Sequence, residues 1–360
     1  MHHRTQDLFL RHRRQRQEQR GHAGQQSHNH VPLELLEHLP VHKLCKADDL
    51  SSHPRRAGWQ EQQKVTKVRR GQDMTLQELV APVEPISLAD IGAACIGETP
   101  VYKPLLDDGL AHLQAFEGDP RQIDRIRETW RDKVTIHDHF LADGGIHTLH
   151  IAAADSGMTS LLRPNATALQ FFNGFQRYGQ IHETRQVQTS RLDDIDGLVD
   201  IDFLKLDVQG AELTVLANGP RRLANCVAIQ LEVSYICLYE NQPPFGEIDL
   251  WMRHNGFLPH CFLEVKKWSI APMLRGNDER RPFNQVLESD IVYVRNLLSL
   301  PTLGVAGLKK LALIAHHCFS SFDLAVRILM ELVSRGAAAP DAHRRYLELL
   351  NAQAAEATRK

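Results

Sequence analysis

The chain has 360 residues, of which 42% are hydrophobic and 24% are charged, and its formal net charge is -2 at pH 7. This size allows a full-sized catalytic core with flanking segments. The near-neutral charge argues against a dedicated nucleic-acid protein or an anionic-membrane protein, since both usually carry a basic excess. No stretch reaches the roughly 18 uninterrupted apolar residues of a membrane span. The 6 cysteines include no CxxC pair, which fits a reducing compartment, and we expect a soluble, cytoplasmic protein.

Residues 1–73 differ in composition from the rest and hold nine of the 20 histidines, mixed with arginine and glutamine. Such a segment cannot bury enough apolar surface to offset its ordering entropy, so we expect it to be disordered. A metal-chelating or RNA-binding arm is the functional alternative, although the histidines lack ligand spacing. The sequence from Met74 onward reads as a natural start of a domain, so residues 1–73 could also result from a wrongly assigned translation start.

From Ile86 onward, short apolar runs alternate with helical patterns, which is typical of an α/β fold. ISLADI, AHLQAF and KVTIHDHF predict strands, and TPVYKPLLDDG and PRQIDRIRETW predict the helices between them. Residues 143–194 contain only short β-like pieces, and we interpret them as an insertion near the active site. After residue 232, PPFGEIDLWMRHNGF predicts a helix, and an antiparallel pair of strands is expected near residues 258–294.

Acidic residues stand at the ends of two predicted strands that flank one helix. Phe203–Leu206 and Val227–Leu231 are the strands, and Gly210–Asn218 is the helix. Ligands of open parallel sheets bind beyond the carboxyl ends of the strands, where Asp207 and Glu232 are expected to project. We therefore assign both a catalytic role, together with Lys205, whose charge in an apolar strand requires a nearby carboxylate partner.

The sequence DIGAACIG, residues 90–97, follows the first predicted strand and is the candidate for binding a cofactor. Its glycines let the backbone approach a ligand, and the residues expected to contact the cofactor are Asp90, Gly92, Ala93 and Gly97. Glu117 ends the second strand, where an acid accepts two hydrogen bonds from a ribose diol. That device serves both NAD and S-adenosylmethionine. A structural turn at residues 90–97 and a helix N-terminal acid at Glu117 are the alternatives.

The motif KLDVQGAE followed by AIQLEVSYICLYENQPPFGEIDLWMRHNGF resembles the FkbM family of S-adenosylmethionine-dependent O-methyltransferases. The resemblance runs from about Ile86 to Arg295. It implies a class I methyltransferase-like (Rossmann-like) fold with a mainly parallel seven-stranded sheet and helices on both faces. It also implies that Asp143 contacts the adenine and that Tyr235, Tyr239 and Asn241 contact the acceptor.

The implied reaction transfers a methyl group from S-adenosylmethionine to a hydroxyl of a sugar, glycan or secondary metabolite. Positioning and a dry pocket supply most of the acceleration, and Asp207 would orient the hydroxyl. Asp207 with Glu232 could hold a divalent metal, but two carboxylates are few and we favour a metal-free route. An NAD-dependent oxidoreductase and a catalytically silent binding module are the alternatives.

We expect three regions along the chain: a disordered segment at 1–73, a methyltransferase domain at 74–298 and a helical C-terminal extension at 299–360. In the extension, LKKLALIAHHCFSSFDLAVRILMELVSRG has apolar residues at helical spacing, and Pro340 breaks the pattern before it resumes. This apolar stripe is expected to pack on the main domain or on a partner helix, which allows a homo-oligomer, rather than to anchor the chain in a membrane.

Overall fold

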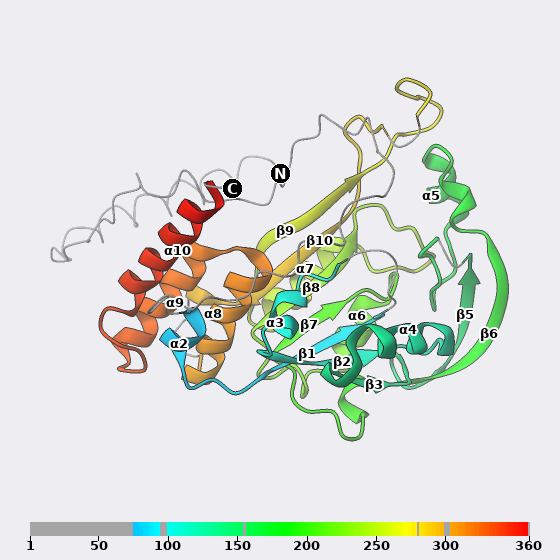
Figure 1. Ribbon diagram of the computed structural model, residues 1–360. Coiled ribbons are helices and arrows are strands. Elements are labelled where there is room, and N and C mark those ends of the chain that lie inside the picture. Colours follow the sequence, from blue (N-terminus) through cyan, green and yellow to red (C-terminus); the bar gives the residue numbers. More distant parts are fainter. Residues whose placement is uncertain (1–74, 94–98, 154–155, 279–280, 299–302, 359–360) are drawn as a thin grey trace, which may run out of the picture. The chain divides into compact units, whose positions relative to one another are not determined.

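A central sheet of seven strands runs through the protein in the order β3-β2-β1-β7-β8-β10-β9 (Figure 1). The strands that pair in parallel are β1 (Ile86–Ile91), β2 (Ala111–Phe116), β3 (Val134–His137), β7 (Phe203–Leu206) and β8 (Ala228–Ser234). β10 (Val286–Arg295) runs antiparallel between β8 and β9 (Phe257–Lys267). This arrangement confirms the predicted mainly parallel seven-stranded sheet and the antiparallel pair at its end.

The computed structural model describes residues 75–93, 99–153, 156–278, 281–298 and 303–358. All of them lie in one compact unit, Pro40–Lys360. The segment expected to be disordered, residues 1–73, lies outside the described residues, as does Gly97 of the predicted cofactor loop. None of the described helices is both long enough and apolar enough to cross a membrane.

The order in which successive strands are added to the sheet reverses between β1 and β7. From β1 the chain continues to β2 and β3 on one side, whereas β7 and β8 extend the sheet on the other side. Such a switch point opens a crevice beyond the carboxyl ends of the two central strands. These strands read as nearly continuous apolar runs because both faces of a parallel sheet are covered.

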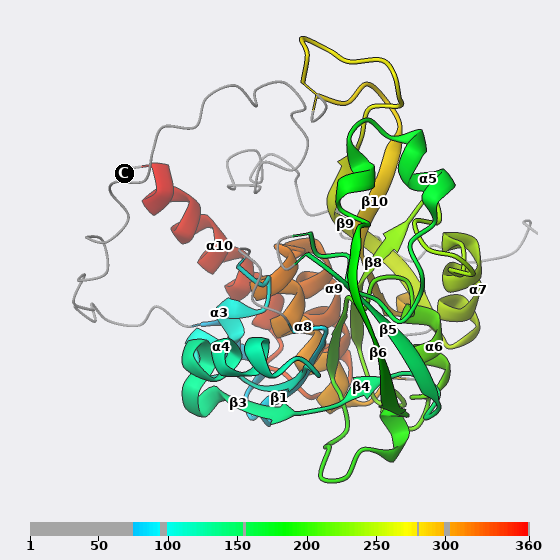
Figure 2. The same ribbon diagram turned by 90° about the vertical axis from the view of Figure 1, so that its right-hand side faces the viewer.

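Helices cover both faces of the sheet (Figure 2). On one face lie α3 (Lys103–Asp107), α4 (Pro120–Trp130) and the C-terminal α8 (Val305–Phe319). On the other lie α6 (Glu212–Ala217) and α7 (Phe245–His254), whose Val215, Leu216, Ile248 and Met252 share a buried cluster with Ile229 and Leu231 of β8. The sheet thus has the two-sided cover that the α/β alternation predicts.

The predicted insertion forms a second, smaller sheet beside the crevice. Its strands are β4 (Phe140–Leu141), β5 (Ile146–Ala152) and β6 (Ile181–Ser190), and α5 (Ala166–Phe171) lies between the last two. The segment predicted as one strand, KVTIHDHF, is divided between β3 and β4 because the chain leaves the main sheet after His137. The insertion has its own apolar cluster, in which Leu169 and Phe172 pack with Leu238 and Tyr239 of the loop after β8.

The C-terminal residues form α8, α9 (Phe322–Ser334) and α10 (Ala342–Thr358). The long helix predicted from the apolar spacing is divided at Ser320, which adopts a left-handed conformation with φ of 52°. α8 packs on the sheet: Lys310 Nζ lies 2.7 Å from Asp202 Oδ2, and the rings of Phe319 and Phe203 meet edge to face at 5.6 Å. α2 (Leu76–Val80) begins at a Thr75 capping box and also contacts α8 and α10.

Candidate active site

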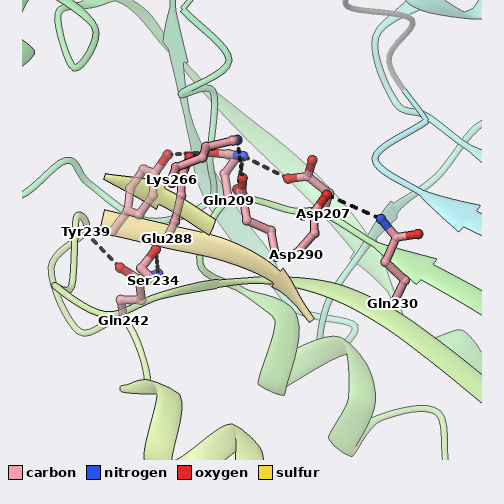
Figure 3. Close-up of polar contacts among 10 residues, drawn as sticks. Asp207, Gln209, Gln230, Ser234, Tyr239, Gln242, Lys266, Glu288 and Asp290 are labelled. Atoms are coloured by element: carbon pink, nitrogen blue, oxygen red, sulfur yellow. Dashed lines mark hydrogen bonds and ion pairs between the residues drawn. The ribbon is translucent and has the colours of Figure 1, made fainter. Parts of the chain in front are cut away.

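Asp207 and Glu232 are joined by one side chain, that of Gln209, whose contact with Asp207 is seen in Figure 3. Asp207 directly follows β7, and Glu232 lies within β8, two residues before its end. The Gln209 amide donates to Asp207 Oδ1 at 2.8 Å and to Glu232 Oε2 at 2.9 Å. The two acids predicted to be catalytic therefore lie within the reach of one amide nitrogen, at the carboxyl edge of the sheet.

Gln209 is fixed in place from several directions. It has a positive φ of 56°, which a non-glycine residue adopts at a cost and which is often found at functional sites. Its side-chain oxygen accepts a hydrogen bond from the Tyr239 hydroxyl at 2.8 Å, and its backbone carbonyl accepts one from Ser160 Oγ at 2.7 Å. Both ends of the amide are thus engaged, and the insertion helps to hold the turn that carries it.

A lysine from β9 balances the negative charge of this cluster. Lys266 Nζ lies 3.1 Å from Glu232 Oε1 and 3.0 Å from Glu288 Oε1 of β10. Burial raises the pKa of Glu232 well above its usual value and the charges of Asp207 and Glu288 raise it further, while Lys266 lowers it. Lys266 therefore favours the charged form of Glu232, whereas burial and the neighbouring carboxylates favour its neutral form.

Lys205 has the carboxylate partner that its position in β7 requires. Its ammonium lies 3.3 Å from Asp90 Oδ1 of the neighbouring strand β1. Burial opposes the charge on Lys205, but Asp90 and Asp207 outweigh it and hold the lysine pKa above its usual value. The catalytic role assigned to Lys205 stays a prediction, since its observed contact is structural.

Four of the residues expected to bind the cofactor, Asp90, Gly92, Ala93 and Glu117, lie on the β1 and β2 side of the crevice. Asp90 is buried and also accepts a hydrogen bond from the Tyr102 hydroxyl at 2.5 Å. Gly92 has a φ of 81°, and a Cβ there would stand 1.9 Å from the backbone oxygen of Asp207. The glycine is therefore required by the close approach of two backbones. The nitrogens of Gly92 and Ala93 both donate to the Phe116 carbonyl, at 3.1 and 3.3 Å.

Glu117 follows β2 and is partly buried. Burial raises its pKa to about 7, opposed by a hydrogen bond from the Asp119 backbone, which donates to Oε1 at 2.8 Å. Asp143 lies elsewhere, in the exposed turn between β4 and β5. Its Oδ1 accepts hydrogen bonds from the Gly145 nitrogen at 2.9 Å and contacts His147 Nε2 at 2.7 Å, and these contacts lower its pKa. Its carboxylate is engaged in the turn that it stabilises.

Of the residues expected to contact the acceptor, Tyr239 is the one that the structure joins to the carboxylates, through Gln209. The Tyr235 hydroxyl lies 2.8 Å from Ser289 Oγ, and its ring packs against Phe245. Asn241 is exposed in a turn with φ of 60°. Glu212, the first residue of α6, accepts hydrogen bonds from the nitrogens of Val208 and Gly210 and holds the turn around Gln209.

Sequence reasoning missed Lys266, Glu288 and Tyr102 as parts of the site. The charged residues of LEVKK and ESD were a usable signal, because they interrupt two strands that pair with each other. Tyr102 gave no comparable signal, since a tyrosine before a short helix is ordinary. In the part of the chain that the structure describes, no group of three or more His, Cys, Asp or Glu side chains is arranged to hold a metal ion.

The strand order, its switch point and the carboxylates at the strand ends define a class I methyltransferase-like domain. Residues 90–259 match the family described as the methyltransferase FkbM domain.

One curated relative is the 2-O-methyltransferase NoeI of Sinorhizobium fredii (strain NBRC 101917 / NGR234). It is 32% identical over 149 residues, which are 38% of this chain and 60% of that protein. The chain therefore spans about three fifths of the length of the curated relative it matches.

Two solved structures show a more distant similarity. Magnesium protoporphyrin IX methyltransferase from Synechocystis PCC 6803, with bound SAM, has 9% identity and a TM-score of 0.30 over 61% of this chain and 76% of that one. Precorrin-6y C5,15-methyltransferase from Geobacter metallireducens GS-15 has 12% identity and a TM-score of 0.29 over 61% and 86%.

Proposed function

We propose that the protein is an S-adenosylmethionine-dependent O-methyltransferase that acts on a hydroxyl of a sugar, glycan or secondary metabolite. The observation that carries the proposal is the Asp207–Gln209–Glu232 network at the carboxyl edge of the sheet, next to the switch point. The FkbM domain supports methyl transfer, and the name of the relative NoeI supports an oxygen acceptor.

The residues on the β2 side fit the proposed cofactor. Glu117 has one oxygen held by the Asp119 nitrogen, and its carboxylate has further lone pairs for the two hydroxyls of a ribose. Its partial burial makes such hydrogen bonds stronger than they are in water. S-adenosylmethionine, when bound, supplies a methyl group on a positively charged sulfur.

The carboxylates after β7 and within β8 would act on the acceptor. Asp207 accepts a hydrogen bond from the acceptor hydroxyl and turns its oxygen toward the methyl carbon. The hydroxyl proton would be shared between Asp207, which orients it, and Glu232, which takes it. The oxygen would form the new C–O bond with the methyl group as the methyl–sulfur bond breaks and S-adenosylhomocysteine leaves. A base works best when its pKa lies near the working pH, and burial moves the pKa of Glu232 upward from that of an ordinary carboxylate.

Calorimetric titration with S-adenosylhomocysteine and with NAD tests this proposal. S-adenosylhomocysteine should bind and should raise the melting temperature, because a ligand that binds only the folded state stabilises it by mass action. NAD should do neither. Binding of NAD without binding of S-adenosylhomocysteine would favour the oxidoreductase alternative and contradict the proposal.

A further inference from the structure

Lys266 is the cation that contacts the carboxylate proposed as the base. It comes from β9, the outermost strand of the sheet, and its ammonium reaches across β10 to Glu232 at 3.1 Å while also contacting Glu288 at 3.0 Å. The side chain of Glu232 is only 11% exposed, so its charge depends on its neighbours more than on water.

Charged and titratable groups face Glu232 from each element packed against it. Asp207 lies after β7, Glu288 and Asp290 lie on β10, Lys266 lies on β9, and Tyr239 lies in the loop after β8. Three of these groups are carboxylates that oppose a charge on Glu232, and the tyrosine is a neutral donor. Lys205 is already paired with Asp90. Lys266 is therefore the group that favours ionisation of Glu232 most directly.

The two oxygens of Glu232 are held by different partners. Lys266 contacts Oε1, and the Gln209 amide donates to Oε2. These contacts prevent the carboxylate from rotating and leave lone pairs on both oxygens for a further donor. The same Gln209 amide aligns Asp207, so the orientation of both acids is linked.

We propose that Lys266 is a positioning residue that favours the ionised form of Glu232 and orients its carboxylate to take the proton of the acceptor hydroxyl. The base role rests on the proposed function, whereas the effect of Lys266 on the charge of Glu232 does not. Loss of the lysine leaves Glu232 beside Asp207 and Glu288 with no neutralising charge in contact.

An infrared pH titration of the ligand-free protein tests the effect on Glu232. The signal of protonated carboxyl groups is followed with pH, and the part missing in Glu232→Gln belongs to Glu232. Removing a cation at this distance should move its titration midpoint upward by about 1–3 pH units in Lys266→Met. Lys266→Gln, which keeps a polar side chain, should give a shift in the same direction if the methionine variant does not fold.

The exposed neighbour Lys267 provides the matched control, and Lys267→Met should leave the midpoint unchanged. Lys266→Arg should move it back toward the value of the unmodified protein, because the positive charge is kept. A Glu232 midpoint that is the same in Lys266→Gln and in the unmodified protein would overturn the proposal. Because no cofactor or acceptor is present, this result is independent of whether methyl transfer occurs.

With an acceptor in hand, the pH profile separates positioning from a purely structural role. The acidic limb of kcat/KM should move upward in Lys266→Gln by the same amount as the infrared midpoint, and Lys266→Arg should restore it. A lower melting temperature with an unmoved acidic limb would show that Lys266 only stabilises the fold and would overturn the proposal.

Discussion

The surroundings of Glu117 disfavour its ionised carboxylate, which is the form that its proposed role in cofactor binding requires. Burial raises its pKa to about 7, whereas an unfolded glutamate titrates at 4.5. Between these two pKa values the folded protein keeps a proton on Glu117 that the unfolded chain has released. Glu117 therefore lowers the free energy of unfolding as the pH rises from about 4.5 to 7. A ligand that donates two hydroxyl hydrogen bonds would favour the ionised form.

Glu117→Gln should have opposite effects on stability and on binding. At pH 8 the ligand-free variant should be more stable than the unmodified protein, because it no longer carries the buried charge. Its affinity for S-adenosylhomocysteine should fall, because an amide oxygen is a weaker acceptor than a carboxylate. Urea unfolding at pH 8 and calorimetry check the two effects. A variant that is less stable at pH 8 or that binds with unchanged affinity would contradict the role given to Glu117.

Both polar atoms of the Gln209 side chain have partners in the ligand-free protein. Gln209→Leu would leave Asp207, Glu232 and the Tyr239 hydroxyl without the group that joins them. We expect a loss of about 1–3 kcal/mol in the free energy of unfolding, the typical cost of unsatisfied buried polar groups. Gln170→Leu, an exposed change on α5, is the control and should have little effect. Equal stabilities of the two variants would show that the network contributes nothing to the fold.

Where the elements meet, the crevice depends on how closely two loops approach each other. The loop after β1 passes the loop after β7 so tightly that the position of Gly92 has no room for a Cβ atom. The nitrogen of Asp207 also donates to the Ile91 carbonyl at 3.0 Å. The position of the proposed catalytic acid is thus fixed by the backbone that begins the cofactor loop.

Gly92→Ala should destabilise the protein more than a matched change at Gly109. Both glycines have positive φ, 81° and 69°, but a Cβ at Gly109 meets nothing within 4 Å. Gly109→Ala should cost about 1 kcal/mol from backbone strain alone, and Gly92→Ala should cost that plus the displacement of Asp207. Urea unfolding of both variants measures the difference. Equal losses in the free energy of unfolding of the two variants would mean that the close approach of the two loops is not required for the fold.

The local pattern of the sequence predicted the elements well, and it predicted contacts between them less well. The strand Phe203–Leu206 and the strand Ile86–Ile91 have the predicted bounds because apolar runs and turn residues are local signals. The contact of Lys266 with Glu232 depends on the order of β8, β10 and β9, which no local pattern encodes. The break at Ser320 was missed because apolar spacing continues through it.

For the molecule as a whole, lysines offset part of the negative charge of the cluster at the carboxyl edge. Lys266 stands between Glu232 and Glu288, and Lys205 pairs with Asp90 close to Asp207. A divalent metal at Asp207 and Glu232 would compete with the Gln209 amide and would be repelled by these ammonium groups. The contacts therefore support the metal-free route, in which carboxylates act directly on the acceptor.

Chelation should accordingly leave the reaction unchanged. EDTA should not alter the rate of methyl transfer, and Glu232→Gln should lower that rate without creating a dependence on magnesium. The measurement is the initial rate with and without chelator, followed by readdition of magnesium. Inhibition that magnesium restores would show that the carboxylates hold a metal.

The most direct test of the account follows labelled methyl groups from S-adenosylmethionine to a panel of sugars, glycans and hydroxylated metabolites. The unmodified protein should label an oxygen of at least one acceptor. Asp207→Asn should lower this rate about 100-fold, since loss of the positioning of a reacting group typically costs that much, while its affinity for S-adenosylhomocysteine stays the same. Undiminished labelling by Asp207→Asn would contradict the assignment of the strand-end carboxylates as the catalytic groups.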